Sequence, residues 1–104
     1  MVKDNYNIEY LPSFDEELGE FLYYITYKLQ NKIAAERLLE NVENAIVSRS
    51  VNPEGFEVYR SVKDRKYNWY RIYLGNFTIF YVVKNNIMIV SHILYSKRNI
   101  EEII

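Results

Sequence analysis

A set of arginine, lysine and tyrosine side chains late in the chain defines the chemistry that this sequence can support. Arg71, Tyr73, Lys97 and Arg98 fall on one face of a predicted sheet or at its margin, where they can surround a phosphate. Cleavage of RNA without a metal needs a base for the 2′-hydroxyl, cations for the phosphorane and an acid for the leaving oxygen. If the chain is a ribonuclease, we expect Arg71, Tyr73 and Arg98 to be catalytic. Arginine is a poor base, however, because it stays protonated.

A second candidate region is a run in which basic residues alternate with aromatic ones, just before the predicted sheet. Such a run can bind phosphates and stack on bases, but it is more often a solvated loop. If it binds, the contacts to nucleic acid or another target are predicted to come from Arg65, Lys66, Trp69, Arg71, Lys97 and Arg98.

Other chemistries have little support in the composition. The chain has no cysteine, which excludes a disulfide framework or a thiolate metal site, and it has no glycine-rich phosphate loop. Its single histidine, His92, is expected on the core face of the sheet, where a structural role is favoured over a catalytic one. We therefore predict no metal and no cofactor.

Charge is distributed unevenly along the chain. Residues 1–57 carry eleven acidic and five basic side chains, whereas residues 58–98 carry eight basic side chains and one acidic. Either the basic half meets an anion, such as nucleic acid or an acidic protein, or the two halves complement each other in the fold.

The length of 104 residues predicts one domain over residues 1–104. The first ten residues lack the apolar segment of a signal peptide, and no apolar run approaches the length of a membrane span. We expect a cytoplasmic protein without membrane contact.

Residues 67–95 read as three strands, YNWYRIYL, FTIFYVV and IMIVSHILY, joined by the two-residue turns Gly75-Asn76 and Asn85-Asn86. Glycine and asparagine tolerate the positive φ that such turns need. The turns fix the register of an antiparallel meander. The predicted pairs are Leu74 with Phe77, Ile72 with Ile79, Tyr70 with Tyr81, Val83 with Met88, Tyr81 with Val90, and Ile79 with His92.

This register sorts the side chains onto two faces. The first face is almost wholly apolar and must be covered by other elements. The second face is mixed, aromatic and partly basic, and we expect function there. Its predicted members are Trp69, Arg71, Tyr73, Thr78, Phe80, Val82, Ile89, Ser91, Ile93 and Tyr95. Four of these form an apolar patch larger than a monomer usually exposes, which predicts a partner at Phe80, Val82, Ile89 and Ile93.

The remaining elements can cover the first face. Residues 6–11 alternate as a half-buried strand that Pro12 ends, and Ser13 with Glu16 resembles a capping box for a helix from Phe14. A second helix is predicted over residues 32–50, and the short connection makes the two an antiparallel hairpin. Residues 97–104 suggest a short C-terminal helix. We predict an α+β fold with the helical hairpin packed on a three- to four-stranded antiparallel sheet.

The order of these elements resembles the RelE/ParE toxins of bacterial type II toxin–antitoxin modules. The segments that carry the resemblance are AAERLLENVENAI, the turn at residues 52–55, WYRIYLGNFTIFYVV and HILYSKRNIEEII, which together span essentially the whole chain. The resemblance implies a toxin that inhibits growth, contributes to plasmid stabilisation and is neutralised by a cognate antitoxin.

The family contains two activities, and the resemblance leaves both open. RelE-like members cleave mRNA on the ribosome, and ParE-like members poison DNA gyrase. Compared with the RelE-like ribonucleases, Arg71 stands where a lysine is usual, and Tyr73 and Thr78 stand where basic residues are usual. Arg98 matches the arginine of the ribonucleases' final basic pair. Their late tyrosine is not matched, and Tyr95 is its nearest substitute. These departures favour a ParE-like, non-ribosomal target. A third reading is an inactivated toxin that only binds the antitoxin.

Overall fold

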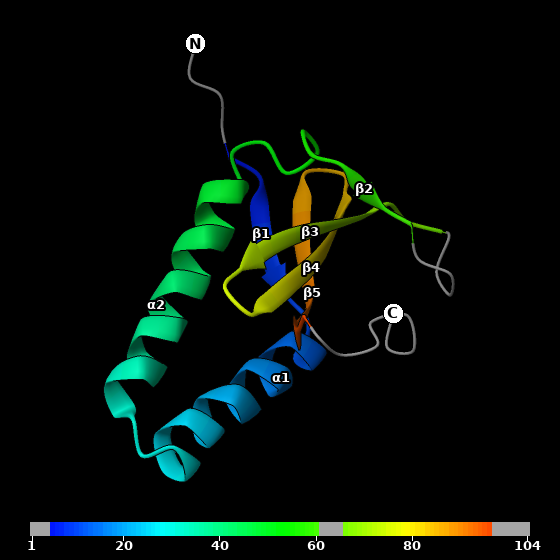
Figure 1. Ribbon diagram of the computed structural model, residues 1–104. Coiled ribbons are helices and arrows are strands. Elements are labelled where there is room, and N and C mark those ends of the chain that lie inside the picture. Colours follow the sequence, from blue (N-terminus) through cyan, green and yellow to red (C-terminus); the bar gives the residue numbers. More distant parts are fainter. Residues whose placement is uncertain (1–4, 61–65, 97–104) are drawn as a thin grey trace.

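The computed structural model describes residues 5–60 and 66–96 (Figure 1). One strand is followed by the helical elements and then by four consecutive strands, in the order that the sequence predicts. They are β1 (Asn7–Tyr10), α1 (Pro12–Tyr23), the π-helix η1 (Tyr24–Lys28), α2 (Lys32–Arg49), β2 (Val58–Tyr59), β3 (Trp69–Leu74), β4 (Phe77–Lys84) and β5 (Ile87–Tyr95). The predicted helix of residues 97–104 lies outside the described residues.

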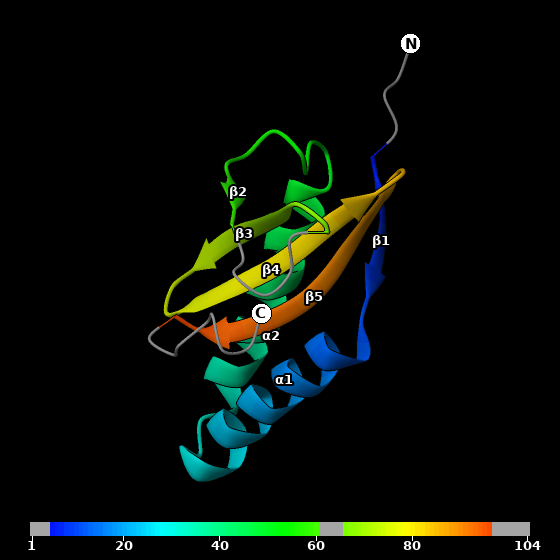
Figure 2. The ribbon, with the colours of Figure 1, turned by 90° about the vertical axis from the view of Figure 1, so that its right-hand side faces the viewer.

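The strands form one sheet in the order β1-β5-β4-β3-β2 (Figure 2). β2, β3, β4 and β5 are antiparallel neighbours, whereas β1 runs parallel to β5. The α+β prediction is therefore confirmed. The sheet has five strands rather than three or four, because both the N-terminal segment and the two-residue β2 join its edges.

The two tight turns set the register of the meander as predicted. Gly75 has φ +59° and Asn85 has φ +58°, the left-handed conformation that these residue types tolerate. Five of the six predicted pairs are confirmed, from Leu74 with Phe77 at the first turn to Tyr81 with Val90 beyond the second.

A β-bulge overturns the sixth pair. The register of β4 and β5 shifts between Phe80 and Tyr81, so Ile79 lies opposite Ile93, and His92 lies opposite Phe80. A bulge adds one residue to one strand, and every later side chain changes face. The predictions for His92, Ile93 and Tyr95 were thus wrong: Ile93 and Tyr95 lie on the first face, and His92 lies on the second.

The helical hairpin covers the first face, as predicted. Phe14 and Leu18 of α1 and Val42 and Ile46 of α2 pack against one apolar cluster of the sheet. The sheet side of this core consists of Tyr70, Ile72, Ile79, Tyr81, Met88, Val90 and Ile93. α1 contacts mainly β5, and α2 contacts β3. In the part of the chain that the structure describes, no helix is long and apolar enough to cross a membrane.

The start of α1 differs from the prediction. The helix begins at Pro12, whose fixed φ and missing N–H suit the first helical position, and no side chain caps it. The Ser13 hydroxyl instead donates a hydrogen bond of 2.7 Å to the carbonyl of Ser91, at the bulge in β5. The supposed capping residue therefore ties α1 to the sheet.

The connection between the helices is short and irregular. α1 continues into η1, Gln30 takes a positive φ of 50°, and the Asn31 side chain caps α2 by accepting from the Ala34 N–H at 3.1 Å. The two helices run in opposite directions and diverge from this connection toward the sheet (Figure 1).

Candidate functional site

The second face of the sheet is the surface that Figure 2 presents, with α2 behind it. Strand pairing places Arg71, Phe80 and His92 in one row across β3, β4 and β5. Trp69 and Tyr73 flank Arg71 on the same face, because alternate residues of a strand point the same way. The bulge thus places His92, the only histidine of the chain, in the same cross-strand row as Arg71, which was already expected on this face.

Arg71 is held by aromatic rings and a carboxylate. Its guanidinium carbon lies 4.6 Å from the centroid of the Tyr59 ring and 5.3 Å from that of Tyr73. One guanidinium nitrogen lies 3.7 Å from the Glu57 carboxylate, which is almost fully exposed. An exposed ion pair of this length is weak, so an incoming anion can compete for the guanidinium.

His92 is fixed by Glu17 of α1. Its Nδ1 lies 3.0 and 3.2 Å from the two carboxylate oxygens, and one of these oxygens also accepts the Ile93 N–H at 3.1 Å. The ring lies 6.2 Å from that of Trp69. The pairing of β1 with β5 ends at Val90, so the Ile93 N–H, further along β5, has no partner in β1. The Glu17 carboxylate accepts its hydrogen bond instead. Glu17 therefore fixes the orientation of the imidazole on the sheet.

The residues predicted to contact an antitoxin do not form one surface. Phe80 and Val82 are buried in a cluster with Trp69 and Leu94, and Ile89 packs against this cluster with part of its surface exposed. Ile93 belongs to the main core on the opposite face. The bulge separates it from the other three.

The predicted target contacts are only partly described. Lys66 places its ammonium 5.4 Å from the centre of the Tyr67 ring, Trp69 is buried, and Tyr73 is 67% exposed. Arg65, Lys97 and Arg98 lie outside the described residues. The structure therefore places Arg71 and Tyr73 together on the second face, and it does not test their pairing with Arg98.

Sequence reasoning missed a partly buried polar cluster at the end of α2. Arg49 donates hydrogen bonds of 2.9 Å to the Tyr81 hydroxyl and to the Arg71 carbonyl, and the Tyr81 hydroxyl donates to the Pro53 carbonyl at 2.6 Å. The Arg49 guanidinium also stacks on Phe56 at 3.5 Å. Burial raises the pKa of Tyr81, although the hydrogen bond and the positive charge of Arg49 act to lower this pKa. This cluster anchors the loop that leads to β2, and hence Tyr59 beside Arg71.

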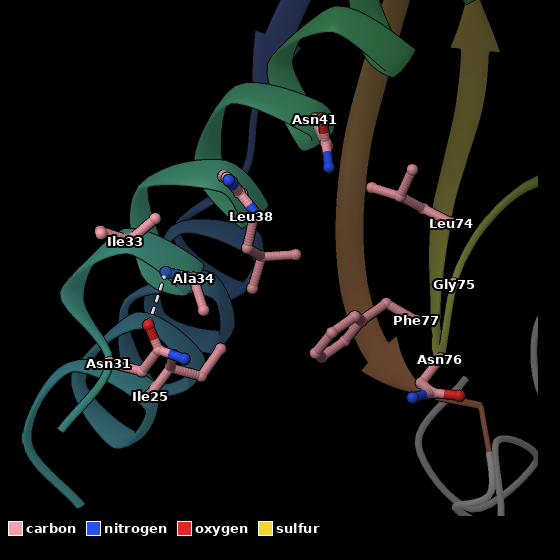
Figure 3. A pocket seen from close by; sticks show the side chains of 11 residues that line it. Ile25, Asn31, Ile33, Ala34, Leu38, Asn41, Leu74, Gly75, Asn76 and Phe77 are labelled. Atoms are coloured by element: carbon pink, nitrogen blue, oxygen red, sulfur yellow. Dashed lines mark hydrogen bonds between the residues drawn. The ribbon is translucent and has the colours of Figure 1, made fainter. Parts of the chain in front are cut away.

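An open groove also separates the helical hairpin from the β3–β4 turn (Figure 3). Its volume is about 390 Å³, with Ile33 and Leu38 of α2 on one side and Leu74 and Phe77 on the other. A second hollow of about 520 Å³ adjoins it, shares Phe77 and is lined mostly by apolar side chains. No local sequence pattern predicts this groove, since its walls are about 40 residues apart in the chain.

Metal chemistry finds no support in the described ranges 5–60 and 66–96. Within them, no group of three or more histidine, aspartate or glutamate side chains is arranged to hold a metal ion. The hydrogen-bonded pair of His92 and Glu17 has no third side chain of that kind beside it among these residues.

Comparisons with known proteins identify relatives by sequence family and by fold. The family model described as the ParE toxin of the type II toxin–antitoxin system, parDE, matches residues 8–100. A search of curated proteins gives no match. The archaeal RelE–RelB complex from Pyrococcus horikoshii OT3 contains a chain with 18% identity and a TM-score of 0.53, over 91% of this chain and 99% of that one. The RelB–RelE antitoxin–toxin complex from Methanococcus jannaschii gives 19% identity and a TM-score of 0.46, over 85% and 89%.

Proposed function

The chain belongs to the ParE toxins of type II toxin–antitoxin systems, and from this premise we propose that it inhibits growth by acting on DNA gyrase or another target outside the ribosome. The observation that carries the proposal is the family match itself. It spans residues 8–100, which contain all the helices and strands except the first residue of β1.

The second face of the sheet supports the same proposal on chemical grounds. Phosphodiester cleavage needs a proton acceptor and a proton donor with usable pKa values. Arg71 stays protonated and is already stacked on Tyr59 and Tyr73 beside Glu57. Such a guanidinium is suited to holding an anionic or aromatic group of a target, and it is poorly suited to moving a proton.

Expression of the chain alone in growing cells tests the target. We expect growth arrest and a DNA-damage response while mRNA stays intact, and we expect the purified chain to inhibit supercoiling by gyrase in vitro. Ribosome-dependent cuts within translated codons, appearing within minutes, would contradict the proposal. Harmless expression would instead favour the inactivated toxin that binds only its antitoxin. Loss of toxicity in Arg98→Ala at unchanged stability would argue against that reading.

We further propose that a cognate antitoxin neutralises the chain. The structurally similar Pyrococcus horikoshii chain comes from a RelE–RelB complex, and the family is defined by toxin–antitoxin pairs. Among the predicted contact residues, Ile89 keeps part of its surface exposed. Phe80 and Val82 are buried, so an antitoxin can reach them only if the side chains that cover them move.

Co-expression with the product of the neighbouring small gene should restore growth. Ile89→Lys should weaken capture of that product, because it adds an unpaired charge to an apolar contact. Val51→Lys, on the exposed loop after α2, is the matched control. Capture that is equally strong in both variants would remove Ile89 from the contact.

Cleavage of mRNA is the second candidate function, and the position of His92 is the observation that favours it. Glu17 orients the imidazole, which lies in the same strand row as Arg71. A base and a cation would then share one face, as RNA cleavage without a metal requires. Under this alternative His92→Gln abolishes mRNA cuts in cells, whereas under the proposed function it leaves the arrest intact.

A further inference from the structure

Exposed apolar side chains are concentrated on the helical hairpin. Of the twelve large apolar side chains that are exposed among the described residues, nine lie on the hairpin or at its entrance. Five form what we call the hairpin tip, at the connection between the helices, and each is between 54% and 65% exposed. They are Tyr23, Tyr24, Tyr27, Leu29 and Ile33. A soluble chain rarely leaves such a group uncovered.

The hairpin tip is basic as well as aromatic. Between Glu20 and Glu36 the sequence contains Lys28 and Lys32 and no carboxylate. Both lysines are exposed. The rings of Tyr23 and Tyr27 lie 4.8 Å apart and make one aromatic surface beside them. A surface of this kind favours a partner that combines apolar and acidic groups.

The opposite end of the same hairpin has that combination. The helices diverge there, and a cleft of about 380 Å³ opens between α1 and α2. We call it the inter-helix cleft. Leu39 and Val47 form part of its exposed apolar wall, and its charged lining residues are Asp15 and Glu43. Burial, Glu43 and Asp15 raise the pKa of Tyr10 at its rim, consistent with a negative potential in the cleft.

We propose that the chain self-associates, with the hairpin tip of one copy seated in the inter-helix cleft of a second copy. The tip and the cleft lie at opposite ends of one hairpin (Figure 1), so two hairpins placed side by side in opposite directions make the contact twice. Such a two-fold arrangement closes as a dimer and leaves neither surface free for further copies. Aromatic side chains supply the apolar burial, and the lysines face the carboxylates of the cleft.

Charge reversal provides a sharp experiment on the purified full chain. Sedimentation equilibrium at low salt should show a dimer that weakens at least tenfold when salt is raised, because salt screens exposed charges. Lys32→Glu and Glu43→Lys should each be monomeric alone. An equimolar mixture of the two variants should dimerise again. In the mixed dimer, residue 32 of each copy faces a residue 43 of opposite charge in the other copy. Lys84→Glu, in the exposed end of β4, should dimerise like the unaltered chain.

Three results would overturn the proposal. The first is an unaltered chain that sediments as a monomer up to millimolar concentration. The second is a dimer that survives both charge reversals. The third is a mixture that stays monomeric although both variants keep the circular dichroism and unfolding midpoint of the unaltered chain. If the chain is monomeric and Tyr27→Ser loses only antitoxin binding, the hairpin tip is a partner site and self-association is wrong.

Discussion

At the scale of single residues, the side chains with the most specific surroundings are those that the sequence did not single out. Arg49, Tyr81 and Glu17 each join segments that are far apart in the chain. Arg71 and Tyr73 were placed correctly because they follow directly from strand alternation. A partner such as Glu17 for His92, 75 positions away, has no signature in local periodicity.

Tyr81→Phe should destabilise the fold, because the Arg49 guanidinium and the Pro53 carbonyl each lose a hydrogen-bond partner. Leaving buried polar groups unpaired costs about 1–3 kcal/mol. Urea denaturation measures this difference at neutral pH. Tyr73→Phe, on an exposed ring, is the control and should change the free energy of unfolding little.

The same substitution has a predictable pH dependence. The pKa of Tyr81 is raised in the folded chain above its ordinary value of 10.0, chiefly by burial. Its neutral form is therefore fully favourable below pH 10 and loses that advantage as pH rises toward the folded-state pKa. The destabilisation by Tyr81→Phe should shrink between pH 9 and pH 11. A difference that grows over this range would contradict the assignment.

Glu17→Ala should also destabilise, by about 1–2 kcal/mol, because the Ile93 N–H loses its acceptor and His92 its partner. Glu16→Ala on the exposed side of the same turn is the matched control. Hydrogen exchange of the Ile93 amide reports the effect locally. Unchanged protection of that amide in Glu17→Ala would show that the bond is not formed in solution.

At the scale of elements, periodicity predicted the helices and strands but not the bulge. The alternation of the meander is intact from Trp69 to Val90, and the register over that range was correct. The pattern then breaks, since polar Ser91 and His92 are adjacent and the next core residue, Ile93, follows Val90 by three positions. That spacing was the available signal. Which residue a bulge extrudes depends on contacts such as that of Ser13, which sequence spacing does not show.

Gly19 and Gly75 should respond to alanine in opposite directions. A Cβ meets no atom within 4 Å at Gly75 or at Gly19, so neither substitution causes a clash. Gly75 has a positive φ, and alanine there should cost about 1 kcal/mol. Gly19 lies inside α1, where alanine should stabilise by roughly 1 kcal/mol. Thermal unfolding of the two variants, compared with the unaltered chain, checks both signs.

At the scale of the whole molecule, the sequence predicted the packing of helices on a sheet and the family, but not the grooves that form between the elements. The charge asymmetry left open whether the two halves complement each other. The structure shows an ion pair from the acidic half to the basic half at Glu57 with Arg71, and a hydrogen bond between Glu17 and His92. The groove beside α2 and the inter-helix cleft arise only when separate elements meet, so no local pattern could predict them.

The parallel pairing of β1 with β5 has a consequence for how the chain is made. β1 and α1 find their main sheet partner in β5, the last of the described strands in chain order, about 80 residues later. At about 5–20 residues per second, a ribosome needs roughly 4–16 seconds to supply that partner. During this interval the N-terminal strand and helix cannot complete their core. The folded sheet, and any activity that depends on it, therefore forms only after β5 has been synthesised.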